Sequence, residues 1–448
     1  MQINKYSTKT LSSTLALLSA SLLVACGGGD DGYGYYDDSV SECSQIGQNR
    51  FVYDVMQQWY FWDASISSSI DPDSYSSVDT LLDAMVANAP ELDRFSYIAE
   101  QESSEKFFEQ GLFTGLGFTS KQINEQLFLA YVFPGSPAAN AGLARGFEIV
   151  SVDGVNVQTT LAAGDFVDFG ASEAGTQVVI DYKDLQGNEF TSSITKAETP
   201  VPTTPVSKVI DNNGVNTGYM FFYTFIEPSN QSLANTFAQF SNDGVQDLIV
   251  DLRYNTGGLI SVANYLSGLI GGTRTQDEVL SKRLHNSQRA SENTTTFFSN
   301  EIVALDLERV IFITTDSTAS ASELVINSLS PYLDVTIVGE TTFGKPVGQY
   351  GFDFCGNTLF PVSFETVNAL DQGRYFTGLE PDCVASDDIT RVIGDEQEAS
   401  LSTALSFLAT GSCPVAQQKS SFKTYSQSSS ELMENTKATR SYRVINAD

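Results

Sequence analysis

Histidine is almost absent from this sequence, and its scarcity limits the chemistry available to the chain. Among 448 residues there is one histidine, His285, and there are five cysteines. Protein zinc sites draw heavily on these two residue types. The chain also contains no Gly-rich phosphate loop of the Walker type. We therefore expect no metal site and no cofactor.

Basic residues are also in short supply. The chain has 24 lysines and arginines against 55 aspartates and glutamates, which gives a formal net charge of −31. A surface this acidic repels nucleic acid phosphates and anionic lipid headgroups, so we expect no nucleic-acid partner. Apolar residues make up 41% of the sequence, and a chain of this length can bury the cores of two or three domains.

The apolar run near the N-terminus is too short to make a good membrane span. Lys5 and Lys9 precede the segment TLSSTLALLSASLLVA, whereas a spanning helix needs about 20 apolar residues. This arrangement is typical of an export signal, here over residues 1–25. Loss of that segment with its two lysines takes the net charge from −31 to −33.

The signal ends in LVAC at residues 23–26 and resembles a bacterial lipoprotein signal. The resemblance implies cleavage before Cys26 and attachment of lipid to that cysteine. The next residue is Gly27, where an aspartate would favour the inner membrane. We therefore expect a membrane-anchored protein on the periplasmic face of the outer membrane of a Gram-negative bacterium. The alternative is an ordinary secretory signal in which Cys26 has no role.

Four cysteines remain after Cys26, and an even number in an exported chain suggests two disulfides. They are Cys43, Cys355, Cys383 and Cys413. Three pairings are possible. We favour 355–383, because these two flank one segment, and 43–413, because these two lie near the ends of the folded region.

Composition divides the chain into parts. Residues 26–45 read as a flexible tether, and residues 413–448 form a polar, serine-rich tail. Residues 46–100 are predicted to form a small helical domain, because apolar residues recur there near i, i+4 spacing. The residues of that stripe are Phe51, Val52, Val55, Met56 and Trp59.

Residues 105–198 resemble a PDZ domain, a β-rich fold with short helices. The resemblance rests on GLGF at 115–118, on GSPAANAGL at 135–143, and on EIVSVDGV after them. In such domains the N–H groups of the glycine-containing loop point into one concavity and bind the carboxylate of a peptide terminus. The strand after the loop pairs with the extended peptide. Gly115, Leu116, Gly117 and Phe118 are thus predicted to bind protein or peptide substrates with free C-termini.

Residues 199–412 alternate apolar strands with helical stretches, which predicts an α/β domain with parallel strands. The segment DSTASASELV in this region places Ser320 after the apolar run VIFIT and at the start of a helix. Ser320 and Glu323 match the capping box that begins many helices. A serine hydroxyl becomes a good nucleophile only when a base removes its proton.

The ASASE run, the motif TFGK twenty-five residues after Ser320, and DLRYNTGG upstream together resemble the carboxyl-terminal processing peptidases, or tail-specific proteases. The resemblance runs from about residue 46 to 412. It implies a multidomain α/β protein whose core, residues 199–412, is a serine protease of the ClpP/crotonase-like type. It also assigns Ser320 as nucleophile, Lys345 as base and Gln349 as the residue that orients the lysine, which is a Ser–Lys variant of triad logic.

The base must lose a proton to act. A free lysine has a pKa of about 10.4, so Lys345 needs a setting in which burial disfavours its charge. Phe343 and Val347 are apolar neighbours, and no acid lies between 341 and 352. The segment departs from the family pattern at Pro346, where glycine or a small residue is usual, and we do not read this as loss of function.

Acyl transfer also needs donors for the oxyanion. The Ala321 N–H is one predicted donor, and Gly257 or Gly258 is the other, since a missing side chain lets backbone approach the substrate. The upstream motif has Tyr254 and Thr256 where asparagine and proline are common. These changes leave both glycines in place.

We therefore predict an exported, lipid-anchored serine endopeptidase with a substrate-binding PDZ domain. One alternative is a non-catalytic lipoprotein that uses the PDZ domain to hold protein tails. Another is a Ser–His hydrolase that uses His285, which lies in a polar stretch and is poorly placed for that role.

Overall fold

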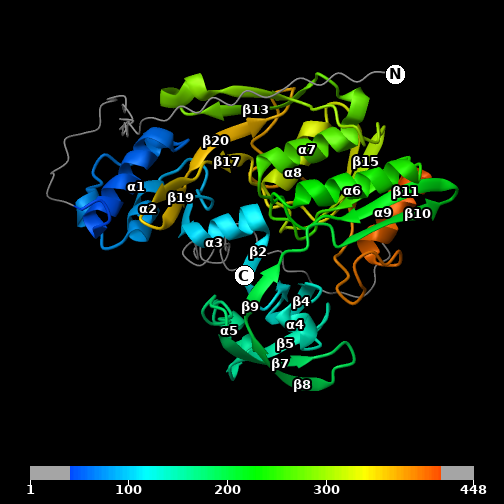
Figure 1. The fold of residues 1–448 in the computed structure, drawn as a ribbon, viewed down its shortest axis with the longest axis horizontal. Helices are drawn as coiled ribbons and strands as arrows, with labels where there is room; N and C mark the ends of the chain where they lie inside the picture. The colour runs from blue at the N-terminus through cyan, green and yellow to red at the C-terminus, as the bar shows by residue number, and fades with distance from the viewer. Residues whose placement is uncertain (1–40, 415–448) are drawn as a thin grey trace, which may run out of the picture. The chain divides into compact units, whose positions relative to one another are not determined.

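The computed structural model describes residues 41–414. Figure 1 shows the arrangement of the labelled elements. The predicted signal peptide, Cys26, most of the tether and nearly all of the tail lie outside the described residues. No helix in the described part combines the length and hydropathy needed to cross a membrane.

The N-terminal helical part begins with two capped helices, α1 (Gln45–Trp59) and α2 (Val78–Val86). The Ser44 hydroxyl accepts from the Gly47 N–H at the start of α1, and Ser77 does the same for Thr80 at the start of α2. Such caps satisfy N–H groups that have no acceptor within the helix. In the predicted apolar stripe, Val52 and Met56 are completely buried.

These helices pack on strands from late in the chain. One core cluster contains residues of α1 and α2 together with Val347, Phe354, Leu359 and Val362. The strands concerned belong to two sheets, of order β14-β13-β20-β17 and β1-β19-β18. Their bounds are β13 (Val279–His285), β14 (Thr294–Phe297), β17 (Val347–Gln349), β20 (Val362–Val367), β1 (Tyr97–Glu100), β18 (Phe352–Phe354) and β19 (Asn357–Phe360).

The PDZ region is a β-rich unit with its own core cluster. Its main sheet has the order β3-β4-β5-β7-β8, β6 pairs with β5, and β2 pairs with β9. The bounds are β2 (Leu112–Gly115), β3 (Phe118–Ile123), β4 (Gln126–Val132), α4 (Pro137–Asn140), β5 (Glu148–Val152), β6 (Val155–Asn156), α5 (Val157–Ala162), β7 (Gln177–Lys183), β8 (Glu189–Thr195) and β9 (Ala197–Pro200). Strand β3 lies at the edge of the sheet, and no other described strand pairs with its outer side.

The sheet of the α/β core has the order β10-β11-β12-β15-β16-β21 and is parallel from β11 onward, with β10 antiparallel at the edge. Its strands are β10 (Val206–Asn212), β11 (Val215–Phe221), β12 (Asp247–Asp251), β15 (Arg309–Thr314), β16 (Asp334–Gly339) and β21 (Cys383–Val384). The helices of this region are α6 (Ser229–Asn242), α7 (Ile260–Gly271), α8 (Ala321–Leu329) and α9 (Ala399–Thr410). The predicted multidomain α/β fold class is confirmed.

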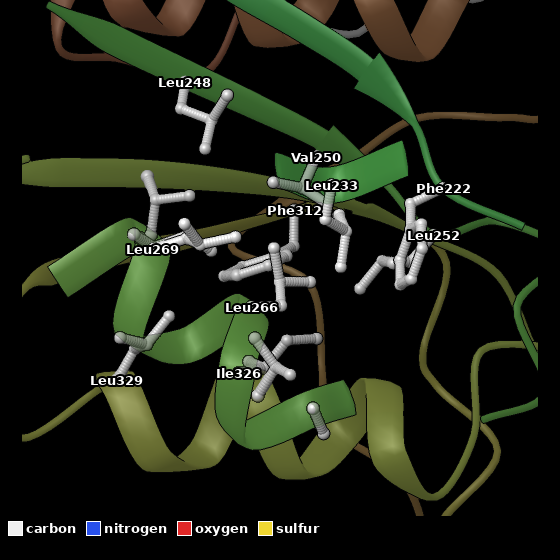
Figure 2. Packing of buried hydrophobic residues seen from close by; sticks show 14 of the residues in the cluster. Phe222, Leu233, Leu248, Val250, Leu252, Leu266, Leu269, Phe312, Ile326 and Leu329 are labelled. Atoms are coloured by element: carbon white, nitrogen blue, oxygen red, sulfur yellow. The ribbon is translucent and has the colours of Figure 1, made fainter. Parts of the chain in front are cut away.

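Both faces of this sheet are buried, which explains why its strands are continuous apolar runs. Leu248 and Val250 of β12 join the cluster formed with α6, α7 and α8, whereas Ile249 joins the cluster formed with α9. This is the two-residue alternation of a strand. Figure 2 shows Leu266 and Leu269 of α7 directed at the sheet residues of the first cluster.

The four cysteines of the described region all form disulfides, as predicted, but both favoured pairings, 355–383 and 43–413, are wrong. The bonds are Cys43–Cys355 and Cys383–Cys413. Cys355 lies in the turn between β18 and β19, a hairpin that packs on α1, as the stacking of Phe51 on Phe354 shows. Cys383 begins β21, and Cys413 follows α9. Pairing thus follows packing between elements rather than position along the chain.

Candidate active site

Three loops follow the carboxyl ends of three adjacent parallel strands, β12, β15 and β16. The first loop contains Gly257 and Gly258 and is called the glycine loop below. The second contains Ser320 and is called the serine loop, and the third contains Lys345 and is called the lysine loop. Because the carboxyl ends of parallel strands meet at one edge of a sheet, this edge is where sites form in α/β folds. The structure therefore brings together the three motifs that the sequence analysis singled out.

Ser320 precedes the first residue of α8 in an unusual backbone conformation. Its φ is 57° and its ψ is −114°, and positive φ is uncommon for a residue with a side chain. A serine on a sharp turn between a strand and a helix is presented at the top of the sheet, an arrangement that α/β-hydrolases use for their nucleophile. Its N–H donates to a carboxylate oxygen of Glu323 at 2.8 Å.

Glu323 links the serine loop to the lysine loop. Its side chain is completely buried, and one of its oxygens accepts from both the Ser320 N–H and the Lys345 N–H, each at 2.8 Å. The other oxygen accepts from Thr342 Oγ1 at 2.5 Å and from the Gly344 N–H at 2.7 Å. The backbone nitrogens of Ser320 and Lys345 are thus held no farther apart than twice 2.8 Å.

These four donors also stabilise the charged form of Glu323. Burial raises the pKa of the Glu323 carboxyl above its ordinary value, and the hydrogen bonds oppose that shift without cancelling it. Only an ionised carboxylate accepts at all four positions, because a protonated carboxyl carries a donor of its own. The four-donor arrangement around Glu323, which we call the Glu323 clasp, therefore requires a buried negative charge.

Gln349 holds the side chain of Lys345. The Lys345 ammonium nitrogen, Nζ, donates to Gln349 Oε1 at 2.5 Å. The Gln349 amide nitrogen donates to the carbonyl oxygens of Phe95 at 2.6 Å and Phe360 at 2.8 Å. Since both amide hydrogens go to carbonyl groups, the amide oxygen must face the lysine. Pro346 comes directly after Lys345, and its carbonyl oxygen accepts from the Thr366 N–H at 2.9 Å. Strand β17 then begins at Val347 and pairs with β20.

Gly257 lies against Ser320. Its φ is 103°, and an added Cβ would stand 2.8 Å from Ser320 Cβ and 2.9 Å from the Ala321 nitrogen. Gly258 has a φ of 134°, and its added Cβ would stand 2.1 Å from the Phe225 carbonyl oxygen. Both positions therefore require glycine, for close approach as well as for conformation. Ala321 is the first residue of α8, so its N–H has no acceptor within the helix.

Asn255, which the sequence analysis did not single out, connects the glycine loop to the serine loop. Its buried side chain accepts from the Gly257 N–H at 2.9 Å and donates to the Phe222 carbonyl at 2.9 Å. Its backbone carbonyl accepts from the Ala319 N–H and from the Ser322 hydroxyl. The only available signal was its place inside the NTGG motif.

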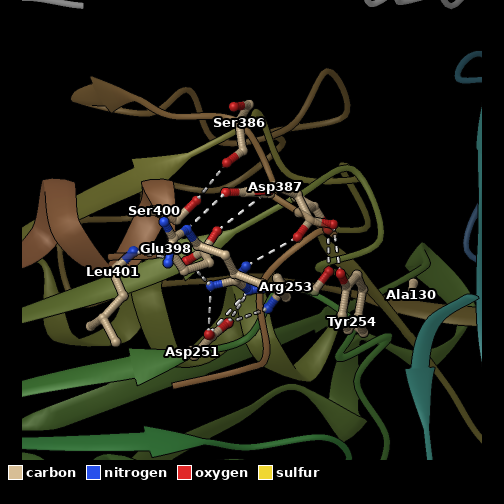
Figure 3. A network of polar contacts seen from close by, with 12 residues as sticks. Ala130, Asp251, Arg253, Tyr254, Ser386, Asp387, Glu398, Ser400 and Leu401 are labelled. Carbon is tan, nitrogen blue, oxygen red and sulfur yellow. Dashed lines mark hydrogen bonds and ion pairs between the residues drawn. The ribbon is translucent and has the colours of Figure 1, made fainter. Parts of the chain in front are cut away.

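A buried network of charges holds the start of the glycine loop (Figure 3). Arg253, which is completely buried, forms ion pairs with Asp251, Asp387 and Glu398. Tyr254 donates to Asp387 at 2.6 Å. Burial works to raise the pKa of Asp387, but the nearby positive charges, Arg253 foremost, hold it well below its usual range.

Tyr254, noted above as a departure from the family pattern, is part of this network. Burial raises its pKa far above the ordinary value, and its hydroxyl contacts both Asp387 and Arg145 of the PDZ region. Its ring is 4% exposed. Tyr254 therefore fixes the start of the glycine loop through its contacts with Asp387 and Arg145.

His285 lies on β13, and both of its ring nitrogens are engaged. Nε2 lies 3.0 Å from the Tyr350 hydroxyl and Nδ1 lies 3.2 Å from Asn293 Oδ1. The ring stacks on Tyr350. This arrangement gives His285 a structural role and leaves no ring nitrogen to pair with Ser320. Within residues 41–414, no cluster of side chains could hold a metal ion.

The predicted carboxylate loop of the PDZ region has its carbonyl groups turned inward. The Leu116 carbonyl accepts from the Ala138 N–H, and the Gly117 carbonyl accepts from the Phe133 N–H and the Ser136 hydroxyl. The side chains of Leu116 and Phe118 are 4% and 9% exposed. They belong to the core of the PDZ region, and Gly115 and Gly117 are buried as well.

Comparison with known proteins matches three family models to the chain. They are the peptidase S41 N-terminal domain over residues 47–97, a PDZ domain over residues 128–184, and peptidase family S41 over residues 216–385. They occur in the same order as the three regions described above. Together they account for the helical part, the PDZ region and the α/β core.

Curated relatives have related names. The chain is 26% identical over 297 residues to the carboxy-terminal processing protease CtpA of Bacillus subtilis, covering 64% of this chain and 60% of the relative. It is 28% identical over 334 residues to the carboxyl-terminal-processing protease of Synechocystis, covering 72% and 74%. A solved structure, a putative S41 protease from Bacteroides fragilis, is 24% identical with a TM-score of 0.65, covering 85% of this chain and all of that one. This last likeness concerns the fold.

The crowding at Gly257 makes a testable prediction. We expect Gly257→Ala to reduce the reaction of Ser320 with a serine-directed fluorophosphonate probe by about 100-fold, because a displacement of about 1 Å at a reacting atom has an effect of that size. Gly244→Ala is the matched control, since Gly244 also has positive φ but nothing lies within 4 Å of its added Cβ. Probe labelling rates and thermal unfolding should be measured for both variants. Equal labelling of the two folded variants would contradict the prediction.

Proposed function

Because the chain belongs to peptidase family S41, we propose that it is a serine endopeptidase in which Ser320 is the nucleophile and Lys345 the general base. The observation that carries this proposal is the Glu323 clasp, in which one buried carboxylate oxygen accepts from the backbone N–H groups of both residues. A helix cap needs the first of these bonds but has no use for the second.

In the proposed reaction the Ser320 hydroxyl oxygen attacks the scissile carbonyl carbon while neutral Lys345 takes the hydroxyl proton. The resulting tetrahedral intermediate collapses when the lysine returns that proton to the leaving amine. Water then hydrolyses the acyl-enzyme with Lys345 as base again. Gln349 orients the lysine by accepting from its ammonium group, and its own position is fixed by two backbone carbonyl groups.

The oxyanion of the intermediate needs donors that are in place before the reaction. We assign one to the Ala321 N–H at the start of α8. For the other we favour Gly258 over Gly257, because the Gly257 N–H already donates to Asn255. The close approach of Gly257 to Ser320 keeps this segment beside the reacting atoms.

Two other functions, a non-catalytic scaffold and a Ser–His hydrolase, fit the site less well. A non-catalytic PDZ scaffold has no need for a Ser–Lys–Gln set, and least of all for a buried carboxylate that joins the two reacting loops. A Ser–His hydrolase requires a ring nitrogen free to accept from serine, whereas both nitrogens of His285 are engaged by Tyr350 and Asn293. The peptidase remains the function best supported.

The base can be tested directly. We expect Ser320→Ala and Lys345→Ala each to lower kcat on an unfolded protein substrate by about a thousandfold or more, since members of a catalytic set act as a unit. The control, His285→Gln, keeps a polar partner for Tyr350 and should retain near-normal turnover. Hydrolysis can be followed by release of fluorescent peptide. Turnover that survives Lys345→Ala but not His285→Gln would refute the dyad.

We further propose that the PDZ region binds the C-terminal region of the substrate. The carbonyl groups of Leu116 and Gly117 are hydrogen-bonded within the PDZ region, and the edge strand β3 begins directly after them at Phe118. An extended peptide can add to that edge, while backbone N–H groups of the loop receive its carboxylate.

Substrate ends should therefore matter. We expect a substrate with a free C-terminus to show an apparent affinity about tenfold higher than the same chain ending in an amide, because charge-assisted hydrogen bonds are worth roughly 1.5–3 kcal/mol each before competition with water. Rates should be compared at low and at high salt, since the acidic surface also repels anionic substrates. Equal rates for both ends at both salt levels would show that the terminus is not recognised.

We also propose that the chain is exported and anchored by lipid on Cys26, at the periplasmic face of the outer membrane of a Gram-negative bacterium. The support is sequence alone, namely LVAC after the short apolar run and Gly27 after the cysteine. An anchored protease would act on exported proteins near that membrane.

Anchoring predicts a clear fractionation result. In a Gram-negative host the wild-type protein should sediment with outer membranes and enter a detergent phase, whereas Cys26→Ser should be released or remain unprocessed. Cys413→Ser serves as a control for the loss of a cysteine as such. Recovery of wild-type protein in the aqueous fraction with an unmodified residue 26 would contradict the anchor.

A further inference from the structure

A rigid turn from the helical domain borders the lysine loop. Asp93 is 2% exposed, and its carboxylate accepts from the N–H groups of Phe95 and Ser96 and from the Ser96 hydroxyl. The Ser96 hydroxyl oxygen also accepts from the Val362 N–H. The same turn supplies the Phe95 carbonyl that holds Gln349. Arg94 lies inside this turn, so its backbone position is well defined.

Arg94 reaches from the turn to the lysine loop. Its Nη2 donates to the Phe343 carbonyl oxygen at 2.8 Å. Its guanidinium carbon lies 4.1 Å from the centre of the Phe343 ring and 5.4 Å from that of Phe95. A planar guanidinium stacks and donates in this way, whereas an ammonium does not.

One peptide group connects Arg94 to Glu323. The peptide between Phe343 and Gly344 accepts at its carbonyl from Arg94 and donates at its N–H to Glu323 at 2.7 Å. Hydrogen bonds in series polarise one another, so a cation at one end strengthens acceptance by the anion at the other. The two charges also attract through space. Burial lowers the pKa of Arg94, and the charge of Glu323 acts in the opposite direction.

Arg94 is a permanent cation whose charge interacts with that of Glu323. Among the described residues, Lys345, through its backbone N–H, and Tyr375 also interact with this carboxylate. Lys345 must be neutral when it acts as base, so it cannot balance the carboxylate at that moment. Burial raises the pKa of Tyr375 far above the ordinary value, so the phenol stays uncharged.

We propose that Arg94 is a positioning residue that keeps Glu323 ionised. The ionised Glu323 in turn holds the backbone N–H groups of Ser320 and Lys345 in their relative positions. This inference rests on the proposed peptidase function and deepens it. It assigns to the N-terminal helical domain an electrostatic part in catalysis, in addition to the carbonyl it provides for Gln349.

The pH dependence follows from the sign of the Glu323 shift. The clasp exists where Glu323 is ionised, which is above its raised pKa, and is lost as the pH falls through that value. Loss of the Arg94 charge raises the pKa further, so the acid limb of the rate profile should move to higher pH. The same loss favours protonation of Lys345, which moves the limb in the same direction. A Glu323→Gln background removes the first contribution and leaves the second.

The experiment is a double-mutant cycle of Arg94→Met and Glu323→Gln, with Arg94→Lys as the charge-preserving control. We expect Arg94→Met to lower kcat at neutral pH about tenfold, to change KM less than twofold, and to move the acid limb upward. Arg94→Lys keeps the charge but not the stacking on Phe343, so it should lose less of the rate than Arg94→Met. In the Glu323→Gln background the further effect of Arg94→Met on kcat should largely disappear, and only the part of the acid-limb shift that comes from Lys345 should remain.

Three results would overturn the proposal. They are a rise in KM at constant kcat, equal damage by Arg94→Lys and Arg94→Met, and effects of the two substitutions that multiply independently. The same cycle measured by thermal unfolding reports the Arg94–Glu323 coupling without turnover. Hydrolysis that Ser320→Ala leaves unchanged would refute the peptidase function itself, and the unfolding cycle would still decide whether Arg94 and Glu323 are coupled.

Discussion

The active edge of this protein depends on one buried carboxylate. Glu323 accepts four hydrogen bonds, two of them from the backbone N–H groups of Ser320 and Lys345. A charge in the interior is costly unless hydrogen bonds replace the lost water. The same four donors that compensate for burial also fix the relative positions of two loops that follow different strands. Removing the charge therefore affects stability and geometry together.

Much of the site was predictable because short motifs place its residues at fixed positions after strands. The two glycines, the serine and the lysine all follow carboxyl ends of parallel strands, and the family resemblance assigned Gln349, four residues after Lys345. Glu323 was recognised only as half of a capping box. That bond exists, but its three further donors come from residues 342–345, and no local pattern announces them.

Other features could not be predicted because they join distant segments through backbone atoms. Gln349 donates to the carbonyl of Phe95, and a carbonyl group has no sequence signature. The disulfide pairs depend on how the β18–β19 hairpin packs on α1 and where α9 ends, which hydrophobic periodicity does not specify. Tyr254 was recognised in the sequence only as a departure from the family motif, whereas its hydroxyl belongs to the charge network around Asp387.

The contact between the Asp93–Ser96 turn and the lysine loop has a consequence for how the protein is made. Arg94 and Phe343 are 249 positions apart, and Phe95 and Gln349 are 254 apart. Contacts of such separation form late, because a long stretch of chain must first be ordered between them. A chain still emerging from the ribosome has made the turn but not the strands that complete the site. The Phe95 carbonyl therefore cannot hold Gln349 until residue 349 has been made, so the two halves of this contact meet only after most of the chain exists.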